Sequence, residues 1–237
     1  MLRDYQYAFN NAIYTEWQHG ARAVVGTAAT GAGKTVCYAA ILQAYNAPAG
    51  LIAHRSELVS QSALALTRER VPHSIIAPKA TIAEIVKLEH ETHGHSAFSW
   101  RAPIRVACVD TLVRENPAEK WLQSIALAIV DEGHHVLRAN KWGETLALMP
   151  NARVLGVTAH AVRADGKGLG RAADGVYDVL VQGPHARELI DRGFLTDYRM
   201  MIPPTDVDFS EVAIGSTGDY SAPQLRAATH KSKRLVG

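Results

Sequence analysis

Residues 23–35 read AVVGTAATGAGKT, an apolar run followed at once by a glycine-rich turn and a lysine–threonine pair. The run at 23–26 has the length of a buried strand, and a helix is expected after the turn. In such a turn consecutive backbone N–H groups face a polyphosphate, with the positive N-terminus of the helix behind them. Ala28 stands where the general phosphate-loop pattern has its first glycine, yet the stretch predicts a strand, a phosphate-binding loop and a helix in succession. The loop residues predicted to bind nucleotide are Ala29, Thr30, Gly31, Ala32, Gly33, Lys34 and Thr35.

The loop and a second, distant stretch together predict chemistry on a nucleoside triphosphate. Lys34 is expected to reach the β- and γ-phosphates, and the hydroxyl of Thr35 to ligate Mg²⁺. Residues 125–132 read IALAIVDE, an apolar strand that ends in two carboxylates. Asp131 is expected to hold the metal from the other side, and Glu132 to orient and deprotonate the attacking water. We therefore predict Lys34, Asp131 and Glu132 as catalytic residues, with Thr35 and Asp131 as the Mg²⁺ ligands.

The composition of the chain excludes several classes of protein. Its 237 residues are 47% hydrophobic, which allows a sizeable core. The formal net charge is +2, so any surface for a polyanionic partner must be local. Cys37 and Cys108 lie in apolar stretches, as is typical of core thiols in a reducing compartment. No apolar run approaches the length of a bilayer span. We expect a cytoplasmic protein with no membrane partner.

Short apolar runs recur along the chain and predict a parallel sheet of the α/β class, buried on both faces by flanking helices. They lie at 23–26, 50–54, 104–110, 125–131 and 153–158. Segment 56–70 between them has helical spacing, with Ser56 in a capping position. Segment 186–192 is predicted as a helix that ends at Gly193. In such sheets ligands bind beyond the carboxyl ends of the strands. We therefore expect the strand-end residues to gather along one rim; they are Thr27, His54, Asp110, Asp131 and Thr158.

The ordered set of motifs resembles the first motor domain of a superfamily 2 helicase or translocase, in the branch with a DEAH-like box. Residues 2–6, LRDYQ, resemble the upstream glutamine motif of that family, in which the glutamine reads the edge of adenine. Residues 51–61 and 109–112 are similar to motifs Ia and Ib, which in the family touch the phosphates of a nucleic-acid strand. Residues 157–160, VTAH, stand in the place of motif III, which couples the nucleotide site to domain movement.

The resemblance implies a RecA-like P-loop NTPase fold with ATP and Mg²⁺ as cofactors, and it adds Gln6 to the nucleotide-binding residues. The coupling residues that it implies are His134, Thr158 and His160. The nucleic-acid contacts that it implies are His54, Arg55, Gln61 and Thr111. Motif III departs from the usual Thr-Ala-Thr-Pro, because His160 and Ala161 replace its second hydroxyl and its proline. The implied partner is double-stranded DNA, although these residues do not distinguish DNA from RNA.

The resemblance also predicts the domain organisation. We expect a RecA-like ATP-binding domain over residues 1–200 and a linker over 201–237 toward a second RecA-like domain, supplied in cis or by a partner subunit. That second domain carries arginines that reach the γ-phosphate, and one such arginine is worth roughly 10³ to 10⁵ in rate. The predicted function is the ATP-binding domain of a nucleic-acid-dependent ATPase that hydrolyses ATP poorly and unwinds nothing alone.

Two other functions stay open at this point. One is a truncated or degenerate module that binds nucleic acid or a protein and uses ATP only as a structural ligand. The other is a P-loop enzyme that transfers phosphoryl groups to a small molecule.

Several of these residues also have a purely structural interpretation. Arg55 could be a solvated arginine and Thr111 a helix cap. His134 could be a histidine hydrogen-bonded at a strand end. Three histidines resemble a metal site, but we predict that they lie in a surface loop; they are His90, His93 and His95. The four tryptophans are scattered, as is typical of packing residues rather than base-stacking ones; they are Trp17, Trp100, Trp121 and Trp142.

Overall fold

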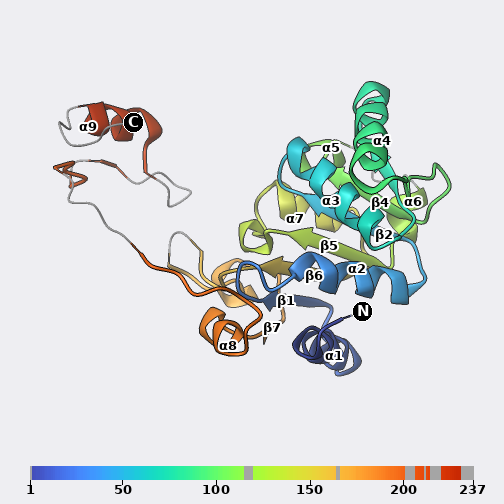
Figure 1. The fold of residues 1–237 in the computed structure, drawn as a ribbon, viewed down its shortest axis with the longest axis horizontal. Helices are drawn as coiled ribbons and strands as arrows, with labels where there is room; N and C mark the ends of the chain where they lie inside the picture. The colour runs from blue at the N-terminus through green and yellow to red at the C-terminus, as the bar shows by residue number, and fades with distance from the viewer. Residues whose placement is uncertain are drawn as a thin grey trace.

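The computed structural model describes residues 2–114, 120–163, 166–200, 206–210, 212–213 and 220–230. Within these residues seven parallel strands form one sheet with the order β3-β4-β2-β5-β6-β1-β7 (Figure 1). The strands are β1 (Ala23–Thr27), β2 (Ala49–Ala53), β3 (Ser74–Ile76), β4 (Ile104–Cys108), β5 (Leu127–Asp131), β6 (Arg153–Thr158) and β7 (Val179–Gln182).

Helices flank this sheet. They are α1 (Asp4–Gln18), α2 (Lys34–Tyr45), α3 (Ser56–Arg68), α4 (Lys79–His93), α5 (Val109–Leu112), α6 (Lys120–Ser124), α7 (Lys141–Ala147), α8 (Ala186–Asp191) and α9 (Ala222–His230), with short 3₁₀ turns at η1 (Gly133–His135) and η2 (Arg171–Ala173). Helices α1 to α4 contact one another in succession along the sheet, and α5 contacts α7. Figure 1 shows α9 apart from the sheet.

The central strands β1, β2, β5 and β6 are buried on both faces, which explains their apolar runs. Every residue of β1 and of β2 is buried, and the core residues Leu51, Ile129 and Leu155 have no exposed surface. Burying a side chain of this size stabilises a fold by about 1.5–3 kcal/mol. The predicted parallel α/β sheet flanked by helices is confirmed.

The structure corrects several predicted elements of the sheet. Strands β3 and β7 were not predicted. The run at 104–110 is a strand only as far as Cys108, because the chain turns there and Val109 begins α5. Strand β5 begins at Leu127 rather than at residue 125.

Predictions for the helices hold in part. Helix α3 begins at Ser56 itself, so the N-cap position falls on Arg55, which makes no side-chain cap. Helix α8 is followed by Gly193 with φ +72°, as the sequence predicted. His90 and His93 lie in the last turn of α4, so the prediction of a surface loop for them was wrong.

The four tryptophans do not share one environment. Trp17 and Trp142 are buried and Trp121 is half-buried, as packing residues would be, whereas Trp100 is 67% exposed. In the part of the chain that the structure describes, no helix combines the length and the apolar character needed to cross a bilayer. The predicted linker falls largely outside the described residues, at 201–205, 211, 214–219 and 231–237.

Candidate active site

The glycine-rich turn after β1 has the backbone geometry of a phosphate loop. Gly31 and Gly33 have φ angles of +83° and +82°, a left-handed conformation that favours glycine. The ammonium group of Lys34 folds back on the loop, with Nζ 3.1 Å from the carbonyl oxygen of Ala28 and 3.4 Å from that of Ala29. These carbonyl contacts place a cation inside the turn, beside the N-terminus of α2.

The N-terminal helix α1 is fixed to this loop through a buried glutamine. Gln6 Nε2 donates a hydrogen bond of 3.0 Å to the carbonyl of Ala32, and Gln6 Oε1 accepts one of 2.9 Å from the backbone N–H of Arg3. The hydroxyl of Tyr5 donates to the same Ala32 carbonyl at 3.1 Å. Gln6 therefore contacts the loop itself, and its contact with adenine stays a prediction.

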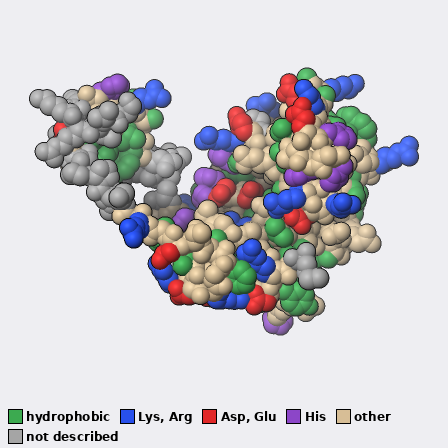
Figure 2. Space-filling view, viewed as in Figure 1, with side chains coloured by type: hydrophobic (Ala, Val, Ile, Leu, Met, Phe, Trp, Pro, Cys, Tyr) green, Lys and Arg blue, Asp and Glu red, His purple; other side chains and the backbone are tan. Residues whose placement is uncertain are grey.

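Strand order brings the loop and the two carboxylates to one rim. Strand β6 lies between β1 and β5, so Thr158 pairs with Thr27, and Val157 pairs with Asp131. Figure 2 shows acidic (red) and histidine (purple) side chains gathered in a hollow of this face. The predicted gathering of strand-end residues along one rim is confirmed for these three strands.

The surroundings shift the pKa values of the two adjacent carboxyl groups in opposite directions. Burial raises the pKa of Asp131 above its ordinary value, and the charge of Glu132 adds to that. A hydrogen bond from His134 lowers the pKa of Glu132 and outweighs the opposing effect of its partial burial. Burial lowers the pKa of Lys34, while the charges of Glu132 and Asp131 act in the opposite direction. Asp131 is thus a half-buried carboxylate that a cation would stabilise.

A histidine joins the carboxylates to the neighbouring strand. His134 Nδ1 lies 2.8 Å from Thr158 Oγ1 and 3.3 Å from Glu132 Oε2. The Thr158 hydroxyl also accepts a hydrogen bond of 3.3 Å from the backbone N–H of His160. The three residues predicted to couple the site are therefore in contact through one buried hydroxyl.

The predicted nucleic-acid contacts lie farther along the same rim. Arg55 and Gln61 are exposed, at the start of α3 and along it. Thr111 lies inside α5 and not at its N-cap, which is Cys108. The ring of His54 stacks on that of His135, with centroids 4.5 Å apart. Sequence reasoning did not predict this stack, because nothing in the sequence pairs position 54 with position 135.

Two more rim contacts were not predicted. Trp142 of α7 stacks parallel to His54 with centroids 5.8 Å apart, and its ring centroid lies 6.5 Å from that of His135. Lys141 Nζ lies 2.8 Å from Asp110 Oδ1. Both contacts join α7 to the ends of β2 and β4, and both pair residues at least 30 positions apart in the sequence.

A cleft of about 690 Å³ opens beside the phosphate loop. It is lined by residues 27–30 of the loop, by 159–162 after β6, and by the segments 182–186 and 195–198. Lys34, Asp131 and Glu132 lie outside this lining. The cleft therefore adjoins the loop and is not the place where the charged residues meet.

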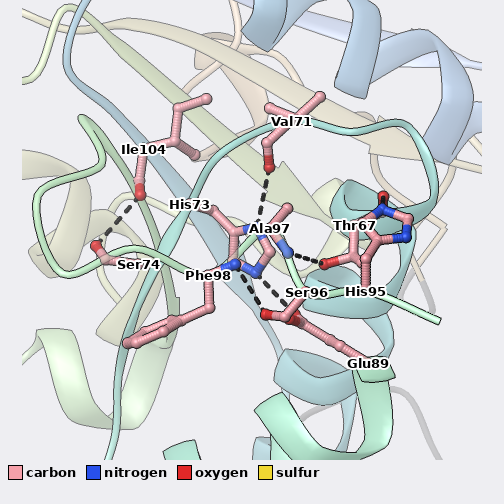
Figure 3. Close-up of polar contacts among 10 residues, drawn as sticks. All are labelled: Thr67, Val71, His73, Ser74, Glu89, His95, Ser96, Ala97, Phe98 and Ile104. Carbon is pink, nitrogen blue, oxygen red and sulfur yellow. Dashed lines mark hydrogen bonds and ion pairs between the residues drawn. The ribbon is translucent and has the colours of Figure 1, made fainter. Parts of the chain in front are cut away.

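A second polar cluster lies away from the rim, between α4 and β3 (Figure 3). His73 Nε2 and Glu89 Oε1 are 3.0 Å apart, and both side chains are fully buried. The other ring nitrogen of His73 lies 3.0 Å from the carbonyl oxygen of Val71. Ser96 donates a hydrogen bond to Glu89 Oε2. Because the side chains of His73 and Glu89 have no exposed surface, this pair has access to no substrate, and it fixes α4 to the edge of the sheet.

Comparison with known protein families and curated proteins agrees with this geometry. Residues 1–163 match the family described as "Type III restriction enzyme, res subunit". The "Putative mitochondrial ATP-dependent helicase irc3" of Schizosaccharomyces pombe is 31% identical over 84% of this chain and 32% of its own length. The "Putative ATP-dependent helicase IRC3" of Saccharomyces cerevisiae is 27% identical over 92% of this chain and 31% of its own length. The chain thus spans about a third of the curated relatives it matches.

Solved structures share the fold at low identity. The UvsW helicase from bacteriophage T4 superposes with a TM-score of 0.56, at 16% identity, over 76% of this chain and 59% of that chain. A nuclease-deletion mutant of the Type ISP restriction-modification enzyme LlaGI, solved in complex with a DNA substrate mimic, gives 0.57 at 13% identity, over 82% of this chain and 21% of that chain.

Proposed function

This chain belongs to the family of the res subunit of type III restriction enzymes and is a RecA-like motor domain of the superfamily 2 helicase type, and we propose that it binds MgATP and DNA as the nucleotide-binding half of a DNA-dependent ATPase. The observation that carries the proposal is the meeting of two sequence-distant motifs at one rim. The loop that holds Lys34 and the turn that holds Asp131 and Glu132 flank β6, and Thr158 lies between them.

The donor set suits a divalent cation bound together with phosphates. A hydroxyl and a carboxylate, from Thr35 and Asp131, are the oxygen ligands that Mg²⁺ takes when phosphate oxygens and water complete its shell. A half-buried carboxylate such as Asp131, whose pKa is raised by its partial burial, gains from such a cation, which restores its ionised form. Bound there, Mg²⁺ would neutralise charge on the β- and γ-phosphates.

The remaining residues have separate tasks in the proposed reaction. Lys34 exchanges the carbonyls of Ala28 and Ala29 for phosphate oxygens, since its ammonium is already held within the loop. Glu132, whose lowered pKa keeps it ionised, accepts the proton of the attacking water. His134 joins that carboxylate to Thr158 and so relates the state of the site to the segment after β6. Gln6 supports the loop and contacts adenine.

The nucleic-acid side of the proposal rests on the rest of the rim. Side chains at this rim and along α3 can contact phosphates without reading bases; the exposed ones are Arg55 and Gln61, and the half-buried ones are His54 and Thr111. The family name favours DNA, because restriction enzymes act on DNA. A second RecA-like domain, reached through residues 201–237, would supply an arginine to the γ-phosphate. Hydrolysis then alternates the affinity for the strand, because a ligand shifts a conformational equilibrium only by binding two states differently.

ATP turnover with and without duplex DNA tests the proposal. Glu132→Gln should keep MgATP affinity within about threefold and lower turnover by about 10²-fold or more, since it removes only the general base. Glu144→Gln, on the exposed side of α7, is the matched control and should leave both unchanged.

Two outcomes would contradict the proposal in different ways. A chain that does not bind MgATP has no nucleotide function. A chain that hydrolyses ATP with no response to DNA would be a P-loop enzyme acting on another substrate.

A further inference from the structure

The segment after β6 returns to the chain at 137–138, directly after the motif at 131–135, and pairs with it there. The backbone N–H of Arg138 donates a hydrogen bond of 2.9 Å to the carbonyl of Asp174, and Leu137 pairs antiparallel with Gly175. The segment is folded on itself where Gly170 pairs with Tyr177. A stretch beyond the residues that the family match covers, 1–163, is therefore built into the proposed active site.

Tyr177 of this segment contacts the turn that follows Glu132. It is 2% exposed, and its hydroxyl donates a hydrogen bond of 2.9 Å to the carbonyl of Gly133. Two glycines leave the space for it: a Cβ on Gly156 would lie 2.0 Å from the Tyr177 hydroxyl, and one on Gly133 would lie 2.7 Å from it. An isolated glycine within a strand marks such a close approach. Burial raises the pKa of Tyr177, so its hydroxyl stays a neutral donor.

The Gly133 carbonyl accepts the hydrogen bond from Tyr177. In the sequence Gly133 lies between Glu132 and His134, the proposed base and its histidine partner. Glu132 precedes Gly133 with φ +54°, a left-handed conformation that costs a non-glycine residue about 1 kcal/mol. His134 follows and contacts both Glu132 and Thr158. The Gly133 carbonyl also accepts a hydrogen bond of 3.2 Å from the N–H of Val136, which closes the turn. The Gly133 carbonyl thus accepts one hydrogen bond from within the turn and one from outside it, and the outside donor is Tyr177.

We propose that Tyr177 is a positioning residue of the ATPase site: its hydroxyl anchors the turn at Gly133 and so holds the Glu132 carboxylate and the His134 imidazole in register with Thr158. The proposal rests on the proposed function for its kinetic consequence. Its geometric part stands on the contacts of Tyr177 alone.

Tyr177→Phe tests the kinetic consequence, because it removes one oxygen and keeps the ring that fills the space above Gly156. We expect kcat for ATP to fall about tenfold while KM and MgATP affinity change less than twofold, since the base is displaced and the phosphate loop is not. Tyr14→Phe is the matched control. Its hydroxyl is buried without a hydrogen-bond partner among the described residues, so its loss should change neither constant.

Imidazole NMR tests the geometric part without any turnover. Tyr177→Phe should shift the ring signals of His134 and leave those of the remote His73 unchanged, whereas Tyr14→Phe should shift neither. Unchanged His73 signals also verify that the variant is folded. A wild-type kcat together with unshifted His134 signals would overturn the proposal. If the wild-type chain neither binds nor hydrolyses ATP, the proposed function fails, and the His134 signals still decide whether Tyr177 holds the turn.

Discussion

Gly33 shows how much one residue decides in the phosphate loop. Its φ is +82°, and a Cβ at this position would lie 2.4 Å from Nε2 of Gln6, which is buried and bonded to Ala32. An added methyl group therefore meets two obstacles, the left-handed backbone and the amide of Gln6.

Gly33→Ala should lower the free energy of unfolding by about 1 kcal/mol for the backbone and by about 1 kcal/mol more for the lost hydrogen bond. Gly20→Ala separates the two costs, because Gly20 has φ +96° and no atom within 4 Å of its Cβ position. Urea unfolding of both variants measures the difference. Equal losses would mean that the Gln6 contact contributes nothing to stability.

Arg55 carries a second prediction for a single side chain. If its guanidinium contacts a DNA phosphate, Arg55→Ala should weaken DNA binding and lower the slope of log affinity against log salt by about 0.9. Arg101→Ala is the matched control, because Arg101 is also exposed and lies in the turn before β4, away from the rim. Fluorescence anisotropy over a range of salt gives both slopes. The same slope for both variants would remove Arg55 from the interface.

Among the elements, α4 depends on one buried pair. Burial raises the pKa of Glu89, but hydrogen bonds from His73 and Ser96 outweigh it, and the pKa of Glu89 lies below its usual value. Its ionised form therefore stabilises the folded state above the pKa of an unfolded glutamate, and this contribution is lost as the pH falls through the lower folded pKa.

Glu89→Gln should lower the free energy of unfolding at neutral pH by about 3–5 kcal/mol, because it leaves the buried His73 without its charged partner. It should also flatten the loss of stability below about pH 4, where unfolded glutamates take up protons. Glu91→Gln on the same helix breaks only the exposed pair with Lys87 and should cost less than about 0.5 kcal/mol. Denaturant unfolding from pH 3 to 7 checks both; an unchanged acid limb in Glu89→Gln would contradict the assignment.

The elements that the sequence predicted are those with a strong local signal. Strands β1, β5 and β6 are mainly apolar runs that end in a motif, and both properties are visible within a few residues. Strand β7 is an edge strand with only one buried residue of its four, and β3 has three residues, so neither has a long apolar run. The turn at Cys108 was missed because Val109 is apolar and continues the run.

The candidate site also has residues that local motifs predict and contacts that only the structure shows. Lys34, Asp131 and Glu132 lie in motifs whose residue types and spacing predict nucleotide chemistry. The contacts of His135 with His54, and of Tyr177 with Gly133, join residues that only the folded sheet brings together. One local signal could have found the second contact, because Gly156 interrupts the apolar pattern of β6.

At the scale of the whole molecule, the greater length of the relatives bears on how fast this chain should hydrolyse ATP. The two curated helicases are matched over 32% and 31% of their lengths, so most of each lies outside the region that this chain matches. If that remainder supplies the arginine of a second RecA-like domain, the isolated chain should bind ATP and turn it over roughly 10³-fold more slowly than a protein with both domains. Single-turnover hydrolysis measures this rate, and efficient strand separation by the chain alone would contradict the prediction.

The place of β1 in the sheet has a consequence for synthesis of the chain. Its neighbours are β6 and β7, so the strand that carries the phosphate loop pairs with nothing from the first 150 residues. While the ribosome is still adding those residues, β2, β3, β4 and β5 can already pair, but β1 must wait for residues 153–182 to emerge. Nucleotide competence therefore arises only after residue 182 has emerged, and an apolar strand stays exposed to chaperones or to aggregation until then.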